Sequence, residues 1–471
     1  MLSFFLVRLY TDKSVLTNLA DYGNLTIIMS YMVFLNVILS YGMETAFFRF
    51  YNSEDNKRKV ISTVTASVFW TSLLFLIVTL LFRINIAHLL KIEPQYLTYA
   101  VWILVLDALV VIPFSKLRAT QKTKKFAILK IGNVVLNLGL NLFFLLLLPK
   151  IAKTNPDGLL ATIFIPKFQI GYILVSNLIA SFFTFLFLSN NYFSISWKID
   201  KTLWKKMINY GLPILVAGIA FAINEHFDKI LLGWQLPKSV AKTVVGTYSA
   251  CYKLGLFMVL FRTAYTMGIE PFFFSHSKNE NAQQTYATIT KYFVIFGSLM
   301  SLATVIFTDL LKTIIIPNPD YWEAIKVVPL IIFANFFLGI YTNLSVWYKL
   351  IDKTKIGAYI SIVGAIVTLV LNYLLIPNYT YFGSAIATIA AYGTMMILSY
   401  YLGKNKYPIP YDMKRIFGYL SISITFSALS FYVDYIRYNY PIKIALLLTF
   451  LYFIYANEKE TLQRIINRKK Q

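Results

Sequence analysis

Long apolar segments follow one another through almost the whole sequence, and each has about the length of one membrane-spanning helix. A helix needs about 20 mostly apolar residues to cross the hydrocarbon core of a bilayer. Short polar stretches separate the segments, and none is long enough for a folded soluble domain. The sequence therefore predicts an all-α, multi-span membrane protein. The thirteen predicted spans are 24–44, 62–82, 96–116, 126–148, 166–189, 209–233, 246–270, 289–309, 324–347, 356–376, 382–402, 415–433 and 440–456.

The composition agrees with this class. Of the 471 residues, 58% are hydrophobic and 14% are charged, whereas soluble domains are about 45–50% apolar and about 25% charged. The net charge of +23 does not indicate a nucleic-acid partner, because the basic residues lie between apolar runs rather than on one soluble surface. Cys251 is the single cysteine and the three histidines are far apart in the sequence. Neither a disulfide framework, a metal site nor a cofactor is therefore predicted.

The basic residues predict which loops face the cytoplasm. When alternate loops are assigned to opposite sides of the membrane, 28 Lys and Arg residues fall on one side and 13 on the other. The positive-inside rule places the richer side, which includes the C-terminal tail, in the cytoplasm. Three basic residues remain inside predicted spans, namely Lys229, Lys253 and Arg262.

The two halves of the chain resemble each other at an offset of about 226 residues. A Gly-x-Glu motif followed by Phe-Phe occurs at 42–48 and again at 268–274, and Lys-Ile-Gly occurs at 130–132 and at 355–357. The offset spans six helices, an even number, so both halves cross the membrane in the same sense. This pattern predicts a parallel repeat whose pseudo-two-fold axis lies along the membrane normal, as in transporters.

The repeat predicts how the chain is divided and how it begins. The offset maps the helix at 209–233 onto positions before residue 1, so Met1–Leu9 is interpreted as the end of an incomplete first helix. We expect either that the natural chain starts upstream or that this helix is defective. The predicted parts are an N-terminal lobe of six helices (1–195), a linker (196–208), a C-terminal lobe of six helices (209–403) and two extra helices with a basic tail (404–471).

The linker has an amphipathic pattern. Four lysines at 198–206 alternate with apolar residues such as Leu203, Trp204 and Met207. An amphipathic helix with lysines on its polar face is typical of the membrane interface. The linker is therefore predicted to be an interfacial helix between the lobes.

Several motifs resemble those of bacterial oligosaccharide flippases. The most specific run is Asp228-Lys229, then Gly246-x-Tyr248-Ser249 and Tyr252-Lys253-Leu254. It is similar to that of the polysaccharide biosynthesis proteins of the multidrug/oligosaccharidyl-lipid/polysaccharide exporter superfamily, and the resemblance covers the chain except for the incomplete first helix. It implies two six-helix lobes around a central cavity in the cell inner membrane. It also implies a substrate, an oligosaccharide on a polyprenyl pyrophosphate that moves from the inner to the outer leaflet.

Charged residues inside the spans are the candidate binding residues, because such charges are costly in lipid and usually face a cavity or a partner. Glu225, Asp228 and Lys229 form the densest cluster. Glu225 and Lys229 are four residues apart on one helix face, with the acid first, which favours an ion pair. Both a mutual ion pair and a role in binding a substrate or an ion remain open for this cluster.

Arg262 lies near the middle of its predicted span and requires an anion. A lipid pyrophosphate would suit it, because a guanidinium group binds phosphate through two parallel hydrogen bonds. The alternative is an ion pair with Asp107, which is also mid-span. Lys253 lies about 180° from Arg262 on a straight helix, so both would face one cavity only if the helix bends or the lumen is wide. Tyr265 follows on the Arg262 face as a candidate for sugar contact or for helix packing.

The remaining candidate residues are two arginines near helix ends and two glutamates that occur at equivalent positions of the repeat. The resemblance implies cavity arginines on the first, second and eighth helices, where Arg8, Arg49 and Arg262 occur, although positive-inside bias alone also explains Arg49. Glu44 and Glu270 occupy equivalent positions of the repeat. Each is predicted to be a structural acid at a helix end that holds basic residues of a loop.

The function predicted from these observations is translocation of a polyprenyl-pyrophosphate-linked oligosaccharide by alternating access, not enzymatic catalysis. The sequence contains no GxxxxGK[ST] motif, so ATP is not the direct energy source. An ion gradient and the membrane potential both remain open as the energy source for transport. The identity of a coupling ion also remains open. The alternatives are a peptidoglycan lipid-precursor flippase and a multidrug or cation antiporter of the same fold. The expected partners are the lipid-linked oligosaccharide and, at the basic loop 116–130, anionic membrane lipids; the protein itself is expected to be a monomer.

Overall fold

The computed structural model describes residues 2–276, 279–351 and 353–468, and within these ranges the regular structure is helical, with no β-strand. Eleven of the described helices are long and apolar enough to cross a membrane. The predicted class of an all-α, multi-span membrane protein is confirmed. One of the eleven, α18 (Lys355–Lys406), contains two predicted spans, which meet at a break in the backbone at Thr380 (φ 49°, ψ −129°). The predicted span 415–433 corresponds to α19 (Met413–Tyr432), which is outside the eleven.

The helices form two compact units, Met1–Gly246 and Thr247–Gln471. The boundary lies later than the predicted division at 208 and 209, because α11 (Lys201–Gln235) packs against α2 and α3 of the first unit. The repeat-based lobes remain a prediction. The other helices of the first unit are α1 (Leu2–Tyr10), α2 (Leu19–Ser40), α3 (Met43–Ser53), α4 (Lys57–Leu81), α5 (Arg83–Leu90), α6 (Pro94–Ala119), α7 (Thr123–Leu142), α8 (Leu148–Thr154), α9 (Gln169–Leu188) and α10 (Asn190–Phe193).

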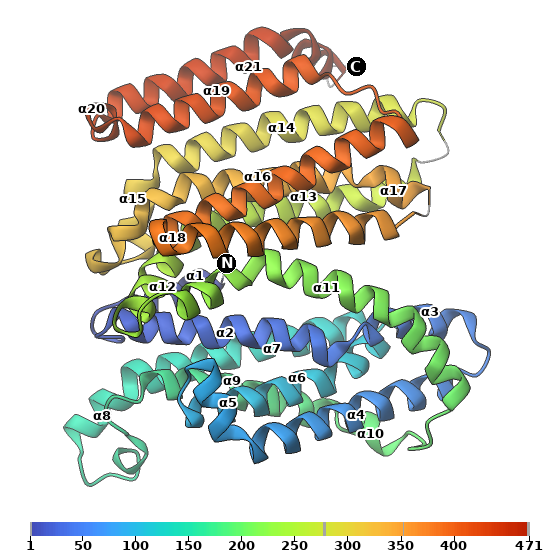
Figure 1. Cartoon of the computed structure of the whole chain (residues 1–471), viewed down its shortest axis with the longest axis vertical. Helices are drawn as coiled ribbons and strands as arrows, with labels where there is room; N and C mark the ends of the chain where they lie inside the picture. The colour runs from blue at the N-terminus through green and yellow to red at the C-terminus, as the bar shows by residue number, and fades with distance from the viewer. Residues whose placement is uncertain (1, 277–278, 352, 469–471) are drawn as a thin grey trace. The chain divides into compact units, whose positions relative to one another are not determined.

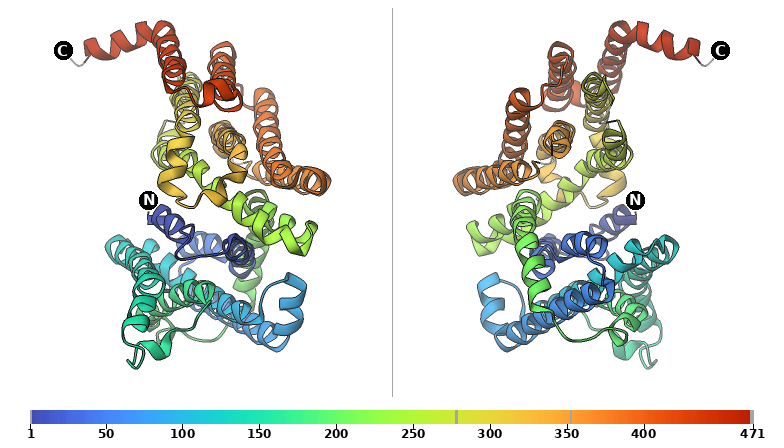
Figure 2. Two further views of the ribbon diagram at one scale, coloured as in Figure 1. Left: turned by 90° about the vertical axis from the view of Figure 1, so that its left-hand side faces the viewer. Right: turned by 90° about the vertical axis from the view of Figure 1, so that its right-hand side faces the viewer.

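The second unit begins within α12 (Lys238–Tyr252), because the boundary between the units lies inside this helix. Its helices α14, α19 and α21 lie next to one another, and α16 packs against α18 (Figure 1, Figure 2). The remaining helices are α13 (Leu256–Ser275), α14 (Ala282–Ile306), α15 (Thr308–Ile315), α16 (Val328–Leu344), α17 (Val346–Leu350), α20 (Asp434–Arg437) and α21 (Tyr440–Arg468).

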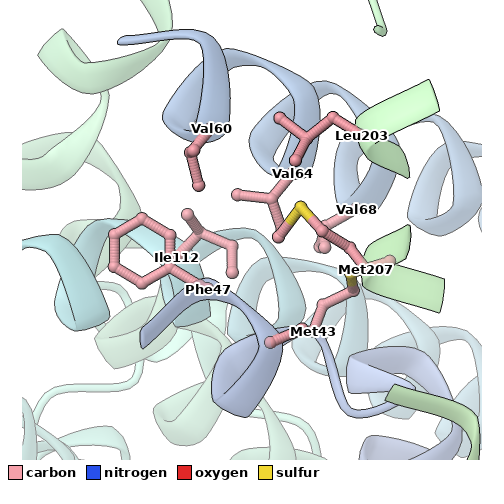
Figure 3. Packing of buried hydrophobic residues seen from close by; sticks show 9 residues of the cluster. Met43, Phe47, Val60, Val64, Val68, Ile112, Leu203 and Met207 are labelled. Carbon is pink, nitrogen blue, oxygen red and sulfur yellow. The ribbon is translucent and has the colours of Figure 1, made fainter. Parts of the chain in front are cut away.

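The predicted interfacial linker leads into the start of α11, and part of its apolar face is buried in protein. Leu203 and Met207 are 5% and 0% exposed and pack against residues of α3, α4 and α6 (Figure 3). Trp204 donates a hydrogen bond from Nε1 to Ser67 Oγ at 2.7 Å. The position of this linker at the membrane interface stays a prediction. The apolar side of an amphipathic helix can be buried against any apolar surface, whether protein or lipid. Here Leu203 and Met207 are buried in the hydrophobic core of the first unit.

Asp200 fixes the start of α11 and ties it to α4. Its side chain accepts a hydrogen bond from the backbone N–H of Leu203 at 2.7 Å, as an N-cap does. Its other carboxylate oxygen lies 2.7 Å from Lys59 Nζ. The hydrogen bond from Lys59, followed by that from Leu203, lowers the pKa of Asp200 below its usual value.

We expect this carboxylate to make the stability of the protein depend on pH in the acid range. A pKa lowered by folding stabilises the fold above the unfolded value, about 3.9 for Asp, and this stabilisation is lost as the pH falls through the folded pKa. Thermal unfolding in detergent between pH 6 and pH 3 should show a smaller acid-induced fall in Asp200→Asn, which keeps the cap but does not titrate. An identical fall in wild type and variant would contradict the prediction.

A glycine permits the sharp break between α2 and α3. Tyr41 and Gly42 both have positive φ, 31° and 73°. A Cβ atom at position 42 would lie 2.3 Å from the carbonyl oxygen of Gly211 in α11. Both the left-handed conformation and the close approach of α11 therefore require glycine at position 42.

Gly42→Ala is expected to destabilise the protein by about 2 kcal/mol, because the new methyl group meets backbone atoms at a strained φ. Gly132→Ala is the matched control, because a Cβ atom there has nothing within 4 Å. Alanine in that helix interior should be neutral or slightly stabilising. The temperature of half-unfolding of the purified proteins measures both effects. Equal stability of the two variants would show that the break does not depend on Gly42.

Candidate functional site

A polar cavity of about 350 Å³ lies inside the first unit. Helices α2, α3, α6, α7 and α9 surround it. Its polar residues lie on apolar helices, where such groups are costly unless they bind one another, water or a ligand. The polar and charged residues that line it are Asn36, Glu44, Asp107, Arg118, Lys130, Asn133, Asn177, Ser181 and Thr184.

Asp107 is the candidate residue that the structure places in this cavity. It accepts a hydrogen bond from Ser181 Oγ at 2.7 Å. Nearby, Asn133 donates a hydrogen bond to Thr184 at 2.9 Å, which joins α7 to α9. These hydrogen bonds orient the polar groups without removing the cavity. The alternative pairing of Asp107 with Arg262 joins residues of different units and stays a prediction.

The polar partners of Asp107 were missed by the sequence reasoning, although their spacing could have revealed them. Asn177, Ser181 and Thr184 recur at i, i+4 and i+7, so they lie on one face of α9. On α7, Lys130, Asn133 and the residues at 137 and 141 form a comparable polar stripe. A polar stripe on an otherwise apolar span indicates a helix face that does not meet lipid.

The two repeated acids form equivalent ion pairs. Glu44 pairs with Arg118 at the end of α6. Glu270 pairs with Lys349 of α17 at 2.6 Å. Each acid therefore holds a basic residue as predicted, but Arg118 and Lys349 lie in helices and not in loops. Glu44 and Arg118 also line the polar cavity of the first unit, a position that the sequence did not indicate.

Lys229 is paired with its neighbour in sequence. Its Nζ atom lies 2.8 Å from Oδ1 and 3.0 Å from Oδ2 of Asp228. Both side chains are buried, with 6% and 4% of their surface exposed. The pairing of Lys229 with Glu225 that helical spacing favours stays a prediction. A lysine stem is long enough to fold back on the adjacent carboxylate of Asp228. This pair neutralises the charge of Lys229 inside the first unit.

Arg262 lies half-buried on α13 of the second unit, beside α16. Its Cγ atom is 3.5 Å from the position that a Cβ atom would take at Gly339 of α16. Tyr265, three residues later, donates a hydrogen bond to Asn343 Oδ1 at 2.5 Å and packs against Phe293, with ring centroids 4.4 Å apart. The α13 face that carries Arg262 is therefore held against α14 and α16, and Tyr265 has a packing role there.

Lys253 lies where the helix is not straight. Lys253–Gly255 form a 3-10 turn between α12 and α13. The tighter winding of a 3-10 turn changes the rotation per residue. The separation of about 180° between Lys253 and Arg262, which holds only for a straight helix, therefore does not apply.

The remaining candidate arginines lie in the first unit. Arg49 is exposed on α3, and its guanidinium carbon is 4.3 Å from the ring centroid of Tyr210 on α11. Arg8 is exposed on α1. Arg49 therefore has an aromatic partner, which accounts for its orientation without a ligand.

Comparison with known proteins relates the chain to two transporter groups. A family profile described as polysaccharide biosynthesis protein matches residues 13–275, more than half of the chain. A second profile, MatE, matches residues 213–374. The Bacillus subtilis (strain 168) protein described as "Probable multidrug resistance protein YoeA" is 21% identical over 236 residues. That match covers 48% of this chain and 50% of the relative, so the chain corresponds to about half the length of this curated protein.

Solved structures show the same fold over nearly the whole chain. The lipid II flippase MurJ in an inward closed conformation matches with a TM-score of 0.75 and 16% identity, over 98% of this chain and 97% of that one. An inward-facing multidrug resistance MATE family transporter of the MOP superfamily matches with a TM-score of 0.64 and 12% identity, over 89% and 96%. The Vibrio cholerae MATE transporter VcmN in the bent form gives 0.54 and 15%, over 91% and 97%. The chain is therefore a membrane protein with the fold of the MOP-superfamily transporters, and it belongs to the polysaccharide biosynthesis protein family.

Proposed function

We propose that the protein is a flippase that moves a polyprenyl-pyrophosphate-linked oligosaccharide across the inner membrane by alternating access. The family match carries the proposal, because it covers more than half of the chain and names polysaccharide biosynthesis. The structural likeness to a lipid II flippase supports a lipid-linked substrate for this fold. In this proposal the pyrophosphate and the sugar enter a central cavity while the lipid tail stays in the bilayer.

The distribution of charge supports an anionic substrate rather than an organic cation. Arg262 and Lys253 bring positive charge to the same stretch of the second unit, and both belong to the predicted cavity surface. A guanidinium group can bind a pyrophosphate oxygen pair through two parallel hydrogen bonds. In the first unit, the polar cavity around Asp107 offers amide and hydroxyl groups that could hydrogen-bond sugar hydroxyls, and Asp107 is also a candidate for a coupling ion.

Two ion pairs support the assignment of successive loops to opposite sides of the membrane, on which the proposed orientation rests. Lys59 pairs with Asp200 in the first unit, and Lys291 pairs with Glu458 in the second. Each pair joins two loops that the sequence assigns to the same, basic side. Together with the positive-inside rule, this supports a cytoplasmic C-terminus.

A peptidoglycan lipid-precursor flippase is the second candidate function. The match to the lipid II flippase MurJ over 98% of the chain favours it. Both substrates carry a pyrophosphate on a polyprenyl chain, so Arg262 would have the same role in both functions. The two candidates differ in the sugar that the cavity accepts.

Complementation of two bacterial strains tests the proposal. The full chain is expressed in one strain that lacks its oligosaccharide flippase and in another that is depleted of its lipid II flippase. We expect surface polysaccharide to return in the first strain and growth not to be rescued in the second. Rescue of the second strain alone would establish the second candidate. Failure in both strains, with the protein present in the membrane, would overturn both proposals, and increased drug resistance in the same cells would then favour an antiporter.

A further inference from the structure

Three basic side chains surround one carboxylate at an end of the second unit. Asp309 of α15 lies 2.7 Å from Lys312 Nζ, 3.2 Å from Arg437 Nη2 and 3.5 Å from Lys443 Nζ. Figure 1 shows α15 and α20, which carries Arg437, at the same end of this unit. The four residues carry three positive charges and one negative charge.

Burial makes this excess of positive charge costly. The side chains of Lys443 and Arg437 are 0% and 9% exposed, and those of Lys312 and Asp309 are 15% and 13% exposed. Within the described ranges, Asp309 is the one carboxylate that forms an ion pair with any of the three cations. One carboxylate balances one cation, and an uncompensated buried charge is strongly destabilising. This excess of positive charge favours a further anion from outside the chain.

The donors of the cluster suit a phosphate group. Arg437 uses Nε and Nη2 to bind Asp309, while Nη1 has no hydrogen-bond partner in the part of the chain that the structure describes. Lys443 donates to the carbonyl oxygen of Ile306 at 3.0 Å and faces Asp309 at 3.5 Å, which leaves one proton of its ammonium group. Because its side chain is fully buried, Lys443 contributes mainly its charge to the cluster. A guanidinium beside ammonium groups is the usual protein environment of a phosphate.

The surroundings place the cluster at the depth of lipid headgroups. Tyr435 and Tyr438 flank Arg437 and are 76% and 72% exposed, and exposed tyrosines are enriched at the interface between membrane and water. Lys312 lies 4.6 Å from the ring centroid of Trp322. In the orientation proposed above, the loops that contain Lys312 and Arg437 face the outer leaflet.

We propose that Lys312, Arg437 and Lys443 form a binding site for the phosphate group of an anionic membrane lipid in the outer leaflet. The lipid phosphate supplies the negative charge that Asp309 alone does not, and it joins α15, α20 and α21. The site does not depend on which substrate the protein carries. Lipid composition would thereby control how firmly the two C-terminal helices are attached.

Native mass spectrometry of the purified full chain tests the site, with phosphatidylglycerol, phosphatidylethanolamine or inorganic phosphate added separately. We expect preferential retention of phosphatidylglycerol and no competition by millimolar phosphate. Each charge should change lipid retention by about fivefold, since a basic residue near an anionic membrane contributes about 1 kcal/mol. Arg437→Gln should therefore retain about fivefold less phosphatidylglycerol, and Asp309→Asn about fivefold more. The control Arg83→Gln removes an exposed cation of the first unit and should leave retention unchanged.

Asp309→Asn separates the lipid site from a purely structural cluster, because the two roles predict opposite results. In a structural cluster, loss of the carboxylate only loosens the helices and cannot increase lipid retention. Reduced or unchanged retention in Asp309→Asn, or equal retention of both lipids by the wild type, would overturn the proposal. Displacement of the lipid by inorganic phosphate would assign the site to a soluble anion instead. If Asp309→Asn does not fold, the wild type and Arg437→Gln decide between these outcomes.

Discussion

Replacing Arg262 by glutamine is expected to abolish the restoration of surface polysaccharide in a strain that lacks its oligosaccharide flippase. A hydrogen bond to a charged group contributes about 1.5–3 kcal/mol, so losing a bidentate contact with pyrophosphate should reduce transport by about 100-fold or more. Glutamine keeps much of the stem that lies beside Gly339. The loss should therefore be one of charge rather than of packing. Surface polysaccharide, measured at equal amounts of protein in the membrane, gives the result.

Two further variants make this experiment specific. Arg262→Lys keeps the charge but not the planar pair of donors, so partial activity is expected. Lys326→Gln removes an exposed cation of the same unit and should transport as the wild type does. Wild-type amounts of polysaccharide with Arg262→Gln would show that Arg262 does not bind the pyrophosphate. A loss in Arg262→Gln together with a lower unfolding temperature would assign the residue to packing.

Replacing Glu458 by glutamine should have the largest effect on stability. Glu458 of α21 is 3% exposed and lies 2.7 Å from Lys291 of α14 and 3.0 Å from Arg415 of α19. Tyr292 and Tyr419 also donate hydrogen bonds to its carboxylate, each at 3.3 Å. Breaking a buried ion pair by removing one partner costs about 3–5 kcal/mol. At roughly 2–4 °C per kcal/mol for a unit of this size, the unfolding temperature in detergent should fall by about 10 °C.

Asp412 supplies a matched control for Glu458, because it binds the same arginine at the surface. Its carboxylate lies 3.4 Å from Arg415 Nε, and both side chains are nearly half exposed. Exposed ion pairs contribute about 0.2–1 kcal/mol, so Asp412→Asn should change the unfolding temperature by no more than about 4 °C. Similar shifts in both variants would mean that Glu458 does not fasten α21 to α14 and α19.

The spans could be predicted from the sequence because hydrophobicity and length are properties of each segment alone. The segment 289–309, for example, is apolar wherever it lies, and it forms α14. The linker could not be assigned in the same way. Its lysines and apolar residues fit a membrane interface and a protein core equally well, and the position of α3 and α4 decided that Leu203 and Met207 lie in the core.

The candidate site was only partly predictable, because residue spacing does not determine which side chains meet in the fold. Spacing identified Glu44 and Glu270 as equivalent acids, and each proved to hold a basic residue. The contact of Lys229 with Asp228 was not indicated by spacing, because the reach of its long side chain includes the adjacent residue as well as the next turn. The roles of Arg262 and Lys253 in binding stay predictions.

By itself the sequence determined an all-α membrane protein with a repeat, a basic side and a family resemblance, because these follow from residue types read in order. Only the tertiary structure decided which polar groups meet. Asp107 faces a cavity lined by four other helices besides its own, Glu458 joins three helices, and Asp309 collects three cations from two distant parts of the chain. The physical reason is that burial of an apolar segment needs no particular neighbour, whereas a buried charge is stable only with a specific partner at a specific distance.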